Sequence, residues 1–473
     1  MKNHSKASGH LSGPSIRVRP PGPKARALFK RSGDDVAVFP PIWGLPLTRA
    51  EGPWIEDVDG NVYLDFISGK SVVNIGHRHP EVVRVLQEQL DRVILGATEN
   101  RFLLAKELAR LTPGDFEKKV FFGSSGSDSV DGALKLAWWA TNRPYILCVA
   151  GAYHGQTHGA LSASSAFSRL VRGFHPAGEL LKIPPPYCYR CPFKLSYPGC
   201  GVQCLDYVES TMLKSHCPPD EVAAVIVEPI FGDMGWVVPP AEYYSRLKQL
   251  CDRHGILLIA DEVQTGCGRT GKWFALEHFG IEADIVCLGK PLASGLPLSA
   301  LVARKELLVS PHRPRELEFH QSFTLEANAL GCAAALATLR VLEREKLIEN
   351  SRSLGAYLLN RLEKMKEAHP LIGDVRGKGL LCTLEIVRNT ETREPAPEQA
   401  EHICRHALAD GLYTMVMGAF SATCIRIAPP LNSTREIIDT GLKILEQAIT
   451  RTEEDLFKGS CSRIPLSGGG RGR

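Results

Sequence analysis

The sequence predicts an α/β protein in which a mostly parallel sheet forms a large domain and a smaller α+β domain accompanies it. Short, continuously apolar runs such as residues 222–230 predict strands that are buried on both faces. These runs alternate with segments in which apolar residues recur at helical spacing, which is typical of a parallel sheet covered by helices. Residues 369–455 return to short mixed elements, and this change predicts the second domain.

The predicted elements follow this alternation along the chain. A turn at Asp59–Gly60 separates two short strands within residues 54–66. The later elements are, in order, a helix after residue 80, a strand, glycine-serine turn and helix within 119–140, strands at 145–155 and 222–230, a helix at 243–255, strands at 256–266 and 282–290, and long helices between 325 and 368.

Composition divides the chain further and excludes some functions. We expect a basic N-terminal arm (1–33), an N-terminal part of the small domain (34–75), a large cofactor-binding domain (76–335), a C-terminal small domain (336–457) and a flexible tail (458–473). The net charge is +4, but residues 1–33 hold eight Lys or Arg and no acid, so the remaining chain carries −4. A nucleic-acid partner is therefore not expected.

The remaining composition bears on location. No run reaches the roughly 18 apolar residues of a membrane span, so no membrane partner is expected. Fourteen scattered cysteines without a secretion signal fit a reducing compartment, and we expect a cytoplasmic protein. The arm is basic and poor in acids, as transit peptides are, but its prolines argue against a clean amphipathic helix.

Polar side chains follow several of the predicted strands, at the sheet edge where open parallel sheets bind ligands. Asp261, Lys290 and Glu228 each end an apolar run, and Tyr153 follows another. A glycine-serine turn, residues 125–127, lies between a strand and a helix, where backbone N–H groups can bind a phosphate. Pyridoxal phosphate requires a lysine for its Schiff base and an acid at its ring nitrogen, so this set indicates that cofactor.

At this point the sequence resembles the class III pyridoxal-phosphate aminotransferases. The strongest resemblance is the stretch 257–300, LLIADEVQTGCGRTGKWFALEHFGIEADIVCLGKPLASGLPLSA, and the whole resemblance runs from about Leu45 to Arg435. Supporting stretches are EDVDGNVYLDFISG, GSSGSDSVDGALKLA, AYHGQTHGALS, VEPIFGDMGWVVPP, FTLEANALGCAAALATL and IRIAPPL. The resemblance implies a fold-type I enzyme that works as a homodimer with its site at the interface.

The resemblance also implies roles on the cofactor. Lys290 would form the internal aldimine and move the proton, Asp261 would keep the pyridinium nitrogen protonated, and Tyr153 would stack on one ring face. Val263 would pack the other face and Gln264 would bond the ring hydroxyl. Ser125, Gly126 and Ser127 would bind the phosphate, with Thr324 reaching a phosphate across the dimer interface. His154 is interpreted as a structural residue.

A second group of residues is implied on the substrate side. Arg426 would bind the substrate carboxylate, and Glu228 would pair with that arginine when no acid is bound. Asp233 stands where the family usually has Glu, and it is a candidate for assisting a second proton transfer. Other departures are Pro291 in place of glycine and Asp128 in place of glutamate.

The leading hypothesis is aminotransfer between an amino acid or amine and a 2-oxo acid. The alternative is amino-acid racemisation or epimerisation, because Asp233 and the segments YCYRCPF and HPLIGDVRGKGLLCTLEIV resemble that branch of the family. Decarboxylation-linked transamination is a third outcome on this scaffold.

Two further patterns suggest other classes of site. GCGRTG (266–271) matches a dinucleotide fingerprint, but no helix is expected to begin there. Cys188, Cys191, Cys200 and Cys204 have a spacing that zinc could use, against the simpler interpretation of a loop with free thiols. We assign no metal to the site.

Overall fold

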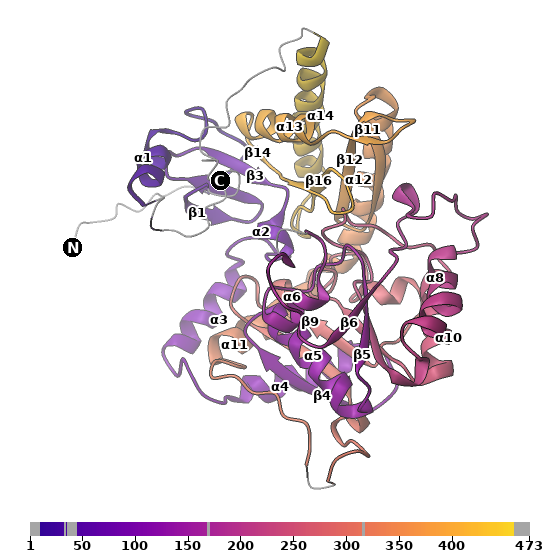
Figure 1. The fold of residues 1–473 in the computed structure, drawn as a ribbon. Coiled ribbons are helices and arrows are strands. Elements are labelled where there is room, and N and C mark those ends of the chain that lie inside the picture. The colour runs from indigo at the N-terminus through magenta and orange to yellow at the C-terminus, as the bar shows by residue number, and fades with distance from the viewer. Residues whose placement is uncertain (1–9, 33–34, 36–44, 168–170, 315–316, 458–473) are drawn as a thin grey trace.

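The computed structural model describes residues 10–32, 35, 45–167, 171–314 and 317–457 (Figure 1). The expected tail (458–473) and the first nine residues of the arm lie outside these ranges. Within the described part of the chain, no helix has the combination of length and apolar character needed to cross a bilayer.

A seven-stranded sheet organises the larger part of the molecule. Its strands lie in the order β4 (Lys118–Gly123), β10 (Ser299–Arg304), β9 (Ile285–Leu288), β8 (Leu257–Asp261), β7 (Val222–Val227), β5 (Tyr145–Val149) and β6 (Glu179–Ile183). The pairings from β9 through β6 are parallel, and only β10 runs antiparallel to both of its neighbours. The predicted mostly parallel sheet is confirmed.

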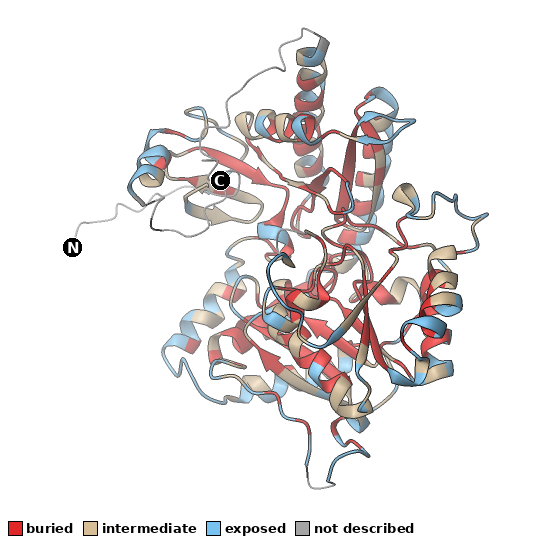
Figure 2. Ribbon diagram, viewed as in Figure 1, coloured by how far each residue is buried: buried red, intermediate tan, exposed pale blue. Residues whose placement is uncertain are grey.

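Alternate residues of these strands pack into two separate apolar clusters, one on each face of the sheet. On β8, Ile259 belongs to the cluster that includes α5 (Gly126–Thr141), whereas Leu258 and Ala260 belong to the other cluster. Both faces are therefore covered, which explains why the strands are continuously apolar in sequence. Figure 2 shows the resulting buried centre.

Helices surround the sheet and extend to the second part of the molecule. Those of the first two-thirds are α2 (Ser68–Ser71), α3 (Pro80–Leu90), α4 (Glu99–Leu111), α6 (His158–Ala163), α8 (Gln203–Tyr207), α9 (Leu213–Ser215) and α10 (Tyr243–His254). The later ones are α11 (Ala329–Arg344), α12 (Leu347–Ala368), α13 (Pro397–Ala409) and α14 (Arg435–Phe457). The domain boundary expected after residue 335 falls inside α11, which packs on α3 and α4.

Two smaller sheets join segments from the two ends of the chain. The first contains β1 (Leu47–Glu51), β2 (Trp54–Asp57), β3 (Val62–Asp65) and β14 (Leu412–Tyr413), and β14 pairs in parallel with β3. The second contains β11 (Ile372–Lys378), β12 (Leu381–Asn389), β13 (Glu394–Pro395), β15 (Val416–Met417) and β16 (Cys424–Ile427). The two strands expected around Asp59–Gly60 are confirmed as β2 and β3.

The N-terminal arm is more ordered than its composition suggested. Residues Pro23–Ser32 form helix α1, although the prolines argued against a helix, because Pro23 occupies its first turn, where proline is well tolerated. The Asp59 carboxylate accepts hydrogen bonds from the backbone N–H groups of Lys24 (2.8 Å) and Ala25 (3.0 Å). The arm is thereby attached to the β2–β3 turn.

Candidate active site

The carboxyl ends of the central parallel strands bring the predicted polar residues together. Asp261 ends β8, Glu228 follows β7, and Lys290 begins a 3-10 turn (Lys290–Ala293) after β9. Burial lowers the pKa of Lys290, an effect that the nearby Asp261, Asp233 and Glu228 oppose. A lysine with a lowered pKa is more often a neutral amine at neutral pH, which is the form that attacks an aldehyde.

Asp261 is held in place by a buried histidine. His154 Nδ1 lies 2.7 Å from Asp261 Oδ2, and the other carboxylate oxygen accepts a hydrogen bond from the backbone N–H of Val263 at 3.0 Å. The His154 Nε2 atom is buried and has no hydrogen-bond partner among the described residues. The histidine interpreted as structural is thus a positioning residue for the carboxylate.

The backbone around Lys290 and the start of α5 is closely packed. A Cβ on Gly126 would lie 2.6 Å from Val263 Cγ1, and one on Gly289 would lie 3.2 Å from Gly126 Cα. Lys290 itself adopts a positive φ of 29°. Glycine is therefore required at 126, because a Cβ there would clash with the Val263 side chain.

The beginning of α5 has the arrangement of an anion site. Ser125 is the N-cap, and the Asp128 carboxylate accepts hydrogen bonds from the N–H groups of Ser124 (2.8 Å) and Ser125 (2.9 Å). Asp128 thus completes a capping box, as the glutamate usual at this position would. The N–H groups of Gly126 and Ser127, in the first turn, have no acceptor within the helix and can bind a phosphate.

These features fit pyridoxal phosphate. The lysine can form a Schiff base, the fixed carboxylate of Asp261 can pair with a protonated ring nitrogen, and the first turn of α5 can bind the phosphate. Val263 lies against the same turn. The Gln264 side-chain oxygen accepts a hydrogen bond from Trp236 Nε1 at 3.1 Å, which fixes the amide beside the site.

The substrate side differs from the prediction in one pairing. Arg426, buried on β16, forms an ion pair with Asp233 rather than with Glu228. The Glu228 carboxylate is turned toward backbone donors, the N–H groups of Tyr153 (2.9 Å) and Gly232 (2.8 Å). These two hydrogen bonds occupy both carboxylate oxygens of Glu228. The next acid along the loop, Asp233, therefore pairs with Arg426.

The surroundings of Glu228 also affect its pKa. Burial, followed by the nearby Asp261, raises the pKa of Glu228 to about 8. Its surroundings therefore disfavour a charged Glu228, and Asp233 is the acid that forms the ion pair with Arg426. The guanidinium is further held by the Met417 sulfur, 2.8 Å from Nε, and lies 5.7 Å from the centre of the Trp236 ring.

Tyr153 and Thr324 are the two remaining residues of the expected site. Tyr153 is half-buried, and its hydroxyl accepts a hydrogen bond from Gln156 at 3.1 Å. Thr324 is exposed, and it does not cap α11, because Asn328 does so through a 2.7 Å bond to the Gly331 N–H. A residue of one chain that reaches another chain's phosphate would be exposed in this way.

A buried network behind the substrate side was missed by sequence reasoning. Glu385 on β12 is fully buried and accepts hydrogen bonds from Tyr187 and Arg190. Arg376 on β11 donates to Glu385 at 2.7 Å, and its Nε donates to the Gly235 carbonyl at 2.7 Å. The network therefore supports the loop that carries Asp233. An acid inside the apolar run LCTLEIV was the available signal.

The patterns that suggested other sites have structural roles. No helix begins within GCGRTG, and its Arg269 is fully buried, donating to Asn74 Oδ1 and to the carbonyl oxygens of Leu380 and Pro429. Cys188, Cys191, Cys200 and Cys204 are free thiols. Burial raises the pKa of Cys188 to about 11 and that of Cys204 to about 12. In the described residues no three His, Cys, Asp or Glu are arranged to hold a metal.

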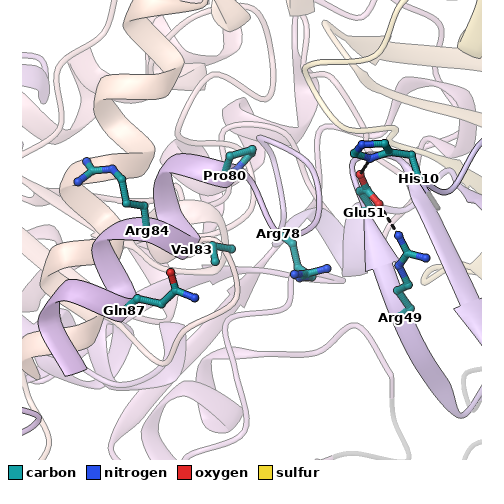
Figure 3. Close-up of a pocket in the computed structure, with 8 residues that line it drawn as sticks. All are labelled: His10, Arg49, Glu51, Arg78, Pro80, Val83, Arg84 and Gln87. Carbon is teal, nitrogen blue, oxygen red and sulfur yellow. Dashed lines mark hydrogen bonds and ion pairs between the residues drawn. The ribbon is translucent and has the colours of Figure 1, made fainter. Parts of the chain in front are cut away.

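A surface pocket lies apart from these residues (Figure 3). It has a volume of about 690 Å³ and is lined by His10, Arg49, Glu51, Arg78, Pro80, Val83, Arg84 and Gln87. None of the predicted site residues lines it.

Comparison with known proteins identifies the family of this chain. Residues 39–449 match the family model of the class III aminotransferases. An alanine/serine racemase from Pyrococcus horikoshii is 41% identical over 93% of both chains, and a probable 4-aminobutyrate aminotransferase from Bacillus subtilis is 34% identical over 85% of this chain and 92% of its own. The crystal structure of a Bacillus anthracis aminotransferase covers 90% of this chain and 99% of its own, with a TM-score of 0.82 and 31% identity. The chain belongs to the class III aminotransferase family of pyridoxal-phosphate enzymes.

Proposed function

We propose that this chain transfers an amino group between an amino acid or amine and a 2-oxo acid. The observation that carries this proposal is Lys290 at the end of β9, whose pKa burial lowers, together with Asp261 at the end of β8, which His154 Nδ1 contacts at 2.7 Å. Pyridoxal phosphate, when bound, supplies the electron sink that makes a proton on the substrate carbon acidic. The Lys290 amine removes that proton, and as an ammonium group it can return it to a neighbouring atom.

The other residues bind and orient. Arg426 binds the substrate carboxylate in place of Asp233, and Asp261 preserves the positive charge on the ring nitrogen. The first turn of α5, with Ser125, Gly126 and Ser127, binds the phosphate, while Tyr153 and Val263 pack against the ring. Gln264 bonds the ring hydroxyl. These roles follow the side chains' positions and the family's chemistry.

We also propose that the enzyme is a homodimer. Several large apolar side chains are exposed in the single chain, on or near α3 and α4 and before α11: Leu90, Val93, Ile94, Leu95, Phe102, Leu103, Leu317 and Leu325. A patch of this kind favours a protein partner. The exposed Thr324 adjoins it, so a second copy on this face would receive Thr324 at its phosphate. Free cysteines favour a cytoplasmic location.

Amino-acid racemisation is a second candidate. Asp233 lies close enough to Lys290 to raise its pKa, so a second titratable group is present beside the proton-transferring lysine. Racemisation needs such a group, because the proton must return to the opposite face of the carbon. The Pyrococcus relative named above is a racemase, which favours testing this reaction directly.

One experiment separates the two reactions. The purified enzyme with pyridoxal phosphate is given one enantiomer of an amino acid in heavy water, with and without a 2-oxo acid. Aminotransfer predicts sustained turnover only with the 2-oxo acid, and amino transfer to that acid. Deuterium at Cα with inversion, and no stoichiometric 2-oxo acid product, would instead establish racemisation and overturn the proposal.

A further inference from the structure

The tip of the β15–β16 hairpin carries an exposed aromatic side chain. The two strands pair antiparallel, with Met417 opposite Cys424, so residues 418–423 form the tip. Arg426 lies on the same hairpin, on β16, and Phe420 within the tip is 39% exposed. A single exposed apolar residue is common on protein surfaces, so a role for Phe420 depends on its backbone and its neighbours.

The backbone of Phe420 is held in a conformation that its side chain disfavours. Its φ is 58°, and that of Ser421 is 61°. A bulky residue rarely adopts left-handed backbone, which glycine adopts without strain. The tip does contain a glycine, Gly418, but not at this position. Such strain persists only where the surroundings enforce it, and it is concentrated at functional sites.

The Phe420 ring packs against two segments of the candidate site. A Cβ added to Gly151 would lie 2.7 Å from Met234 Sδ and 3.0 Å from Phe420 Cδ2, so the three residues meet at one point. Gly151 lies two residues before Tyr153, and Met234 directly follows Asp233. The ring is therefore beside both the segment that carries Tyr153 and the loop that carries Asp233.

Apolar groups also surround the guanidinium of Arg426. The Met417 sulfur lies 2.8 Å from its Nε, and the guanidinium carbon lies 5.7 Å from the centre of the Trp236 ring. Asp233 is engaged in the ion pair with Arg426, and Gln264 accepts a hydrogen bond from Trp236. An amino acid whose carboxylate binds Arg426 brings its side chain to the same neighbourhood. Aromatic and thioether groups there would stabilise an apolar side chain by burying it.

We infer that Phe420 is a specificity residue, whose ring contacts the side chain of the amino-acid substrate and favours an apolar side chain larger than a methyl group. This inference rests on the proposed function. Contact with such a substrate would bury the exposed ring and so stabilise the complex, whereas the methyl group of alanine offers little surface for this contact. An acidic side chain would lose water without gaining a partner. The parent enzyme should therefore have a lower KM for leucine than for alanine or glutamate.

The test compares Phe420→Gly and Phe420→Leu in the enzyme loaded with pyridoxal phosphate, with leucine and alanine as substrates. We expect Phe420→Gly to raise KM for leucine about tenfold, because the apolar contact is lost, and to raise KM for alanine less than about twofold. Phe420→Leu should stay within about threefold of the parent for both substrates, since an apolar side chain is kept. Leu456→Ala is the matched control, because Leu456 is similarly exposed, at 37%, on α14, which carries none of the candidate site's residues.

Stability separates a functional ring from a structural one. Glycine adopts the left-handed backbone at position 420 without strain, so Phe420→Gly should unfold at no lower urea concentration than the parent. A raised KM for leucine in a variant of unchanged stability would support the contact with the substrate. A fall in the urea midpoint with equal changes in KM for leucine and alanine would show that the ring supports the hairpin, and would overturn the inference.

The remaining outcomes separate this inference from the proposed function. An unchanged ratio of the leucine and alanine KM values in Phe420→Gly, together with raised KM values in Arg426→Ala, would overturn the role of Phe420 and leave the carboxylate site intact. If the enzyme racemises amino acids instead of transferring amino groups, the same ratio is measured for racemisation, so the inference is tested even when the proposed function fails. A parent enzyme that prefers alanine or glutamate to leucine would overturn it. So would a Phe420→Gly variant that changes only its oligomeric state in size-exclusion chromatography, because the ring would then belong to an interface.

Discussion

The two halves of the candidate site are built in different ways. On the cofactor side, Asp261 ends β8, while Lys290 and the first turn of α5 follow β9 and β4 of the same sheet. On the substrate side, Asp233 and Arg426 form an ion pair although they are 193 residues apart in the sequence. The cofactor half is set by one rigid layer, whereas the substrate half depends on how separate segments meet.

This difference predicts which substitutions remove chemistry and which change specificity. The cofactor side is held by short-range backbone contacts, such as those of Asp128 with Ser124 and Ser125. The substrate side is held by ion pairs between distant segments and by the network around Glu385. Losses on the first side should appear in kcat, and losses on the second should appear in KM.

The largest effect is expected for Lys290→Ala. Removing the amine that moves the proton should lower kcat by about 10⁴-fold, the upper end of what a positioned general base contributes. The visible absorbance of the bound cofactor should change as well, while circular dichroism shows an unchanged fold. A Lys290→Ala variant that retains both the parent's spectrum and its turnover would contradict the role of Lys290 on the cofactor side.

Asp261→Ala should have the second-largest effect. We expect kcat to fall about a hundredfold, which corresponds to a rise of ~3 kcal/mol in the activation barrier. The ring nitrogen would then lack the carboxylate that keeps it protonated. His154→Ala should cost less, because it only orients Asp261 through the 2.7 Å contact, and Asp284→Ala serves as a control on the same sheet. If Asp261→Ala changes KM but not kcat, the expectation that losses on the cofactor side appear in kcat is wrong.

The residues expected on the cofactor side lie at strand ends and a helix start, as the sequence indicated, whereas one pairing on the substrate side differs, and there is a physical reason. Strand ends and helix starts are local features, so Lys290, Asp261 and residues 125–127 could be identified from their neighbours in the chain. The Arg426 pairing depends on which of two acids has its oxygens occupied by backbone N–H groups, and Glu228 was chosen wrongly.

Arg426→Ala should act mainly on KM. Losing one charged hydrogen-bonding partner costs about 2–3 kcal/mol, so KM for amino acids should rise roughly 30- to 150-fold. Arg451→Ala, at an ion pair with Asp410 away from the site, is the control. A comparable loss with amines that lack a carboxylate would mean that Arg426 only supports the structure, and the substrate side would lose its defining residue.

The substitution with the smallest expected effect, Tyr187→Phe, tests whether contacts between distant segments position the residues of the substrate side. Tyr187→Phe removes the hydroxyl that donates to Glu385 and accepts from Arg376 at 2.8 Å. Because Arg376 also holds the Gly235 carbonyl, we expect a severalfold rise in KM and a loss of about 1–2 kcal/mol in the free energy of unfolding, measured by urea denaturation.

The matched control for this change is Tyr197→Phe. The Tyr197 hydroxyl also donates to a glutamate, Glu242, at 2.8 Å, but at an exposed position, so its loss should change neither quantity measurably. If Tyr187→Phe lowers stability but leaves KM unchanged, the network supports the fold without positioning Asp233. If Tyr187→Phe raises KM, the network behind the site positions the loop that carries Asp233. The substrate side is then set by contacts between distant segments, and this property distinguishes it from the cofactor side.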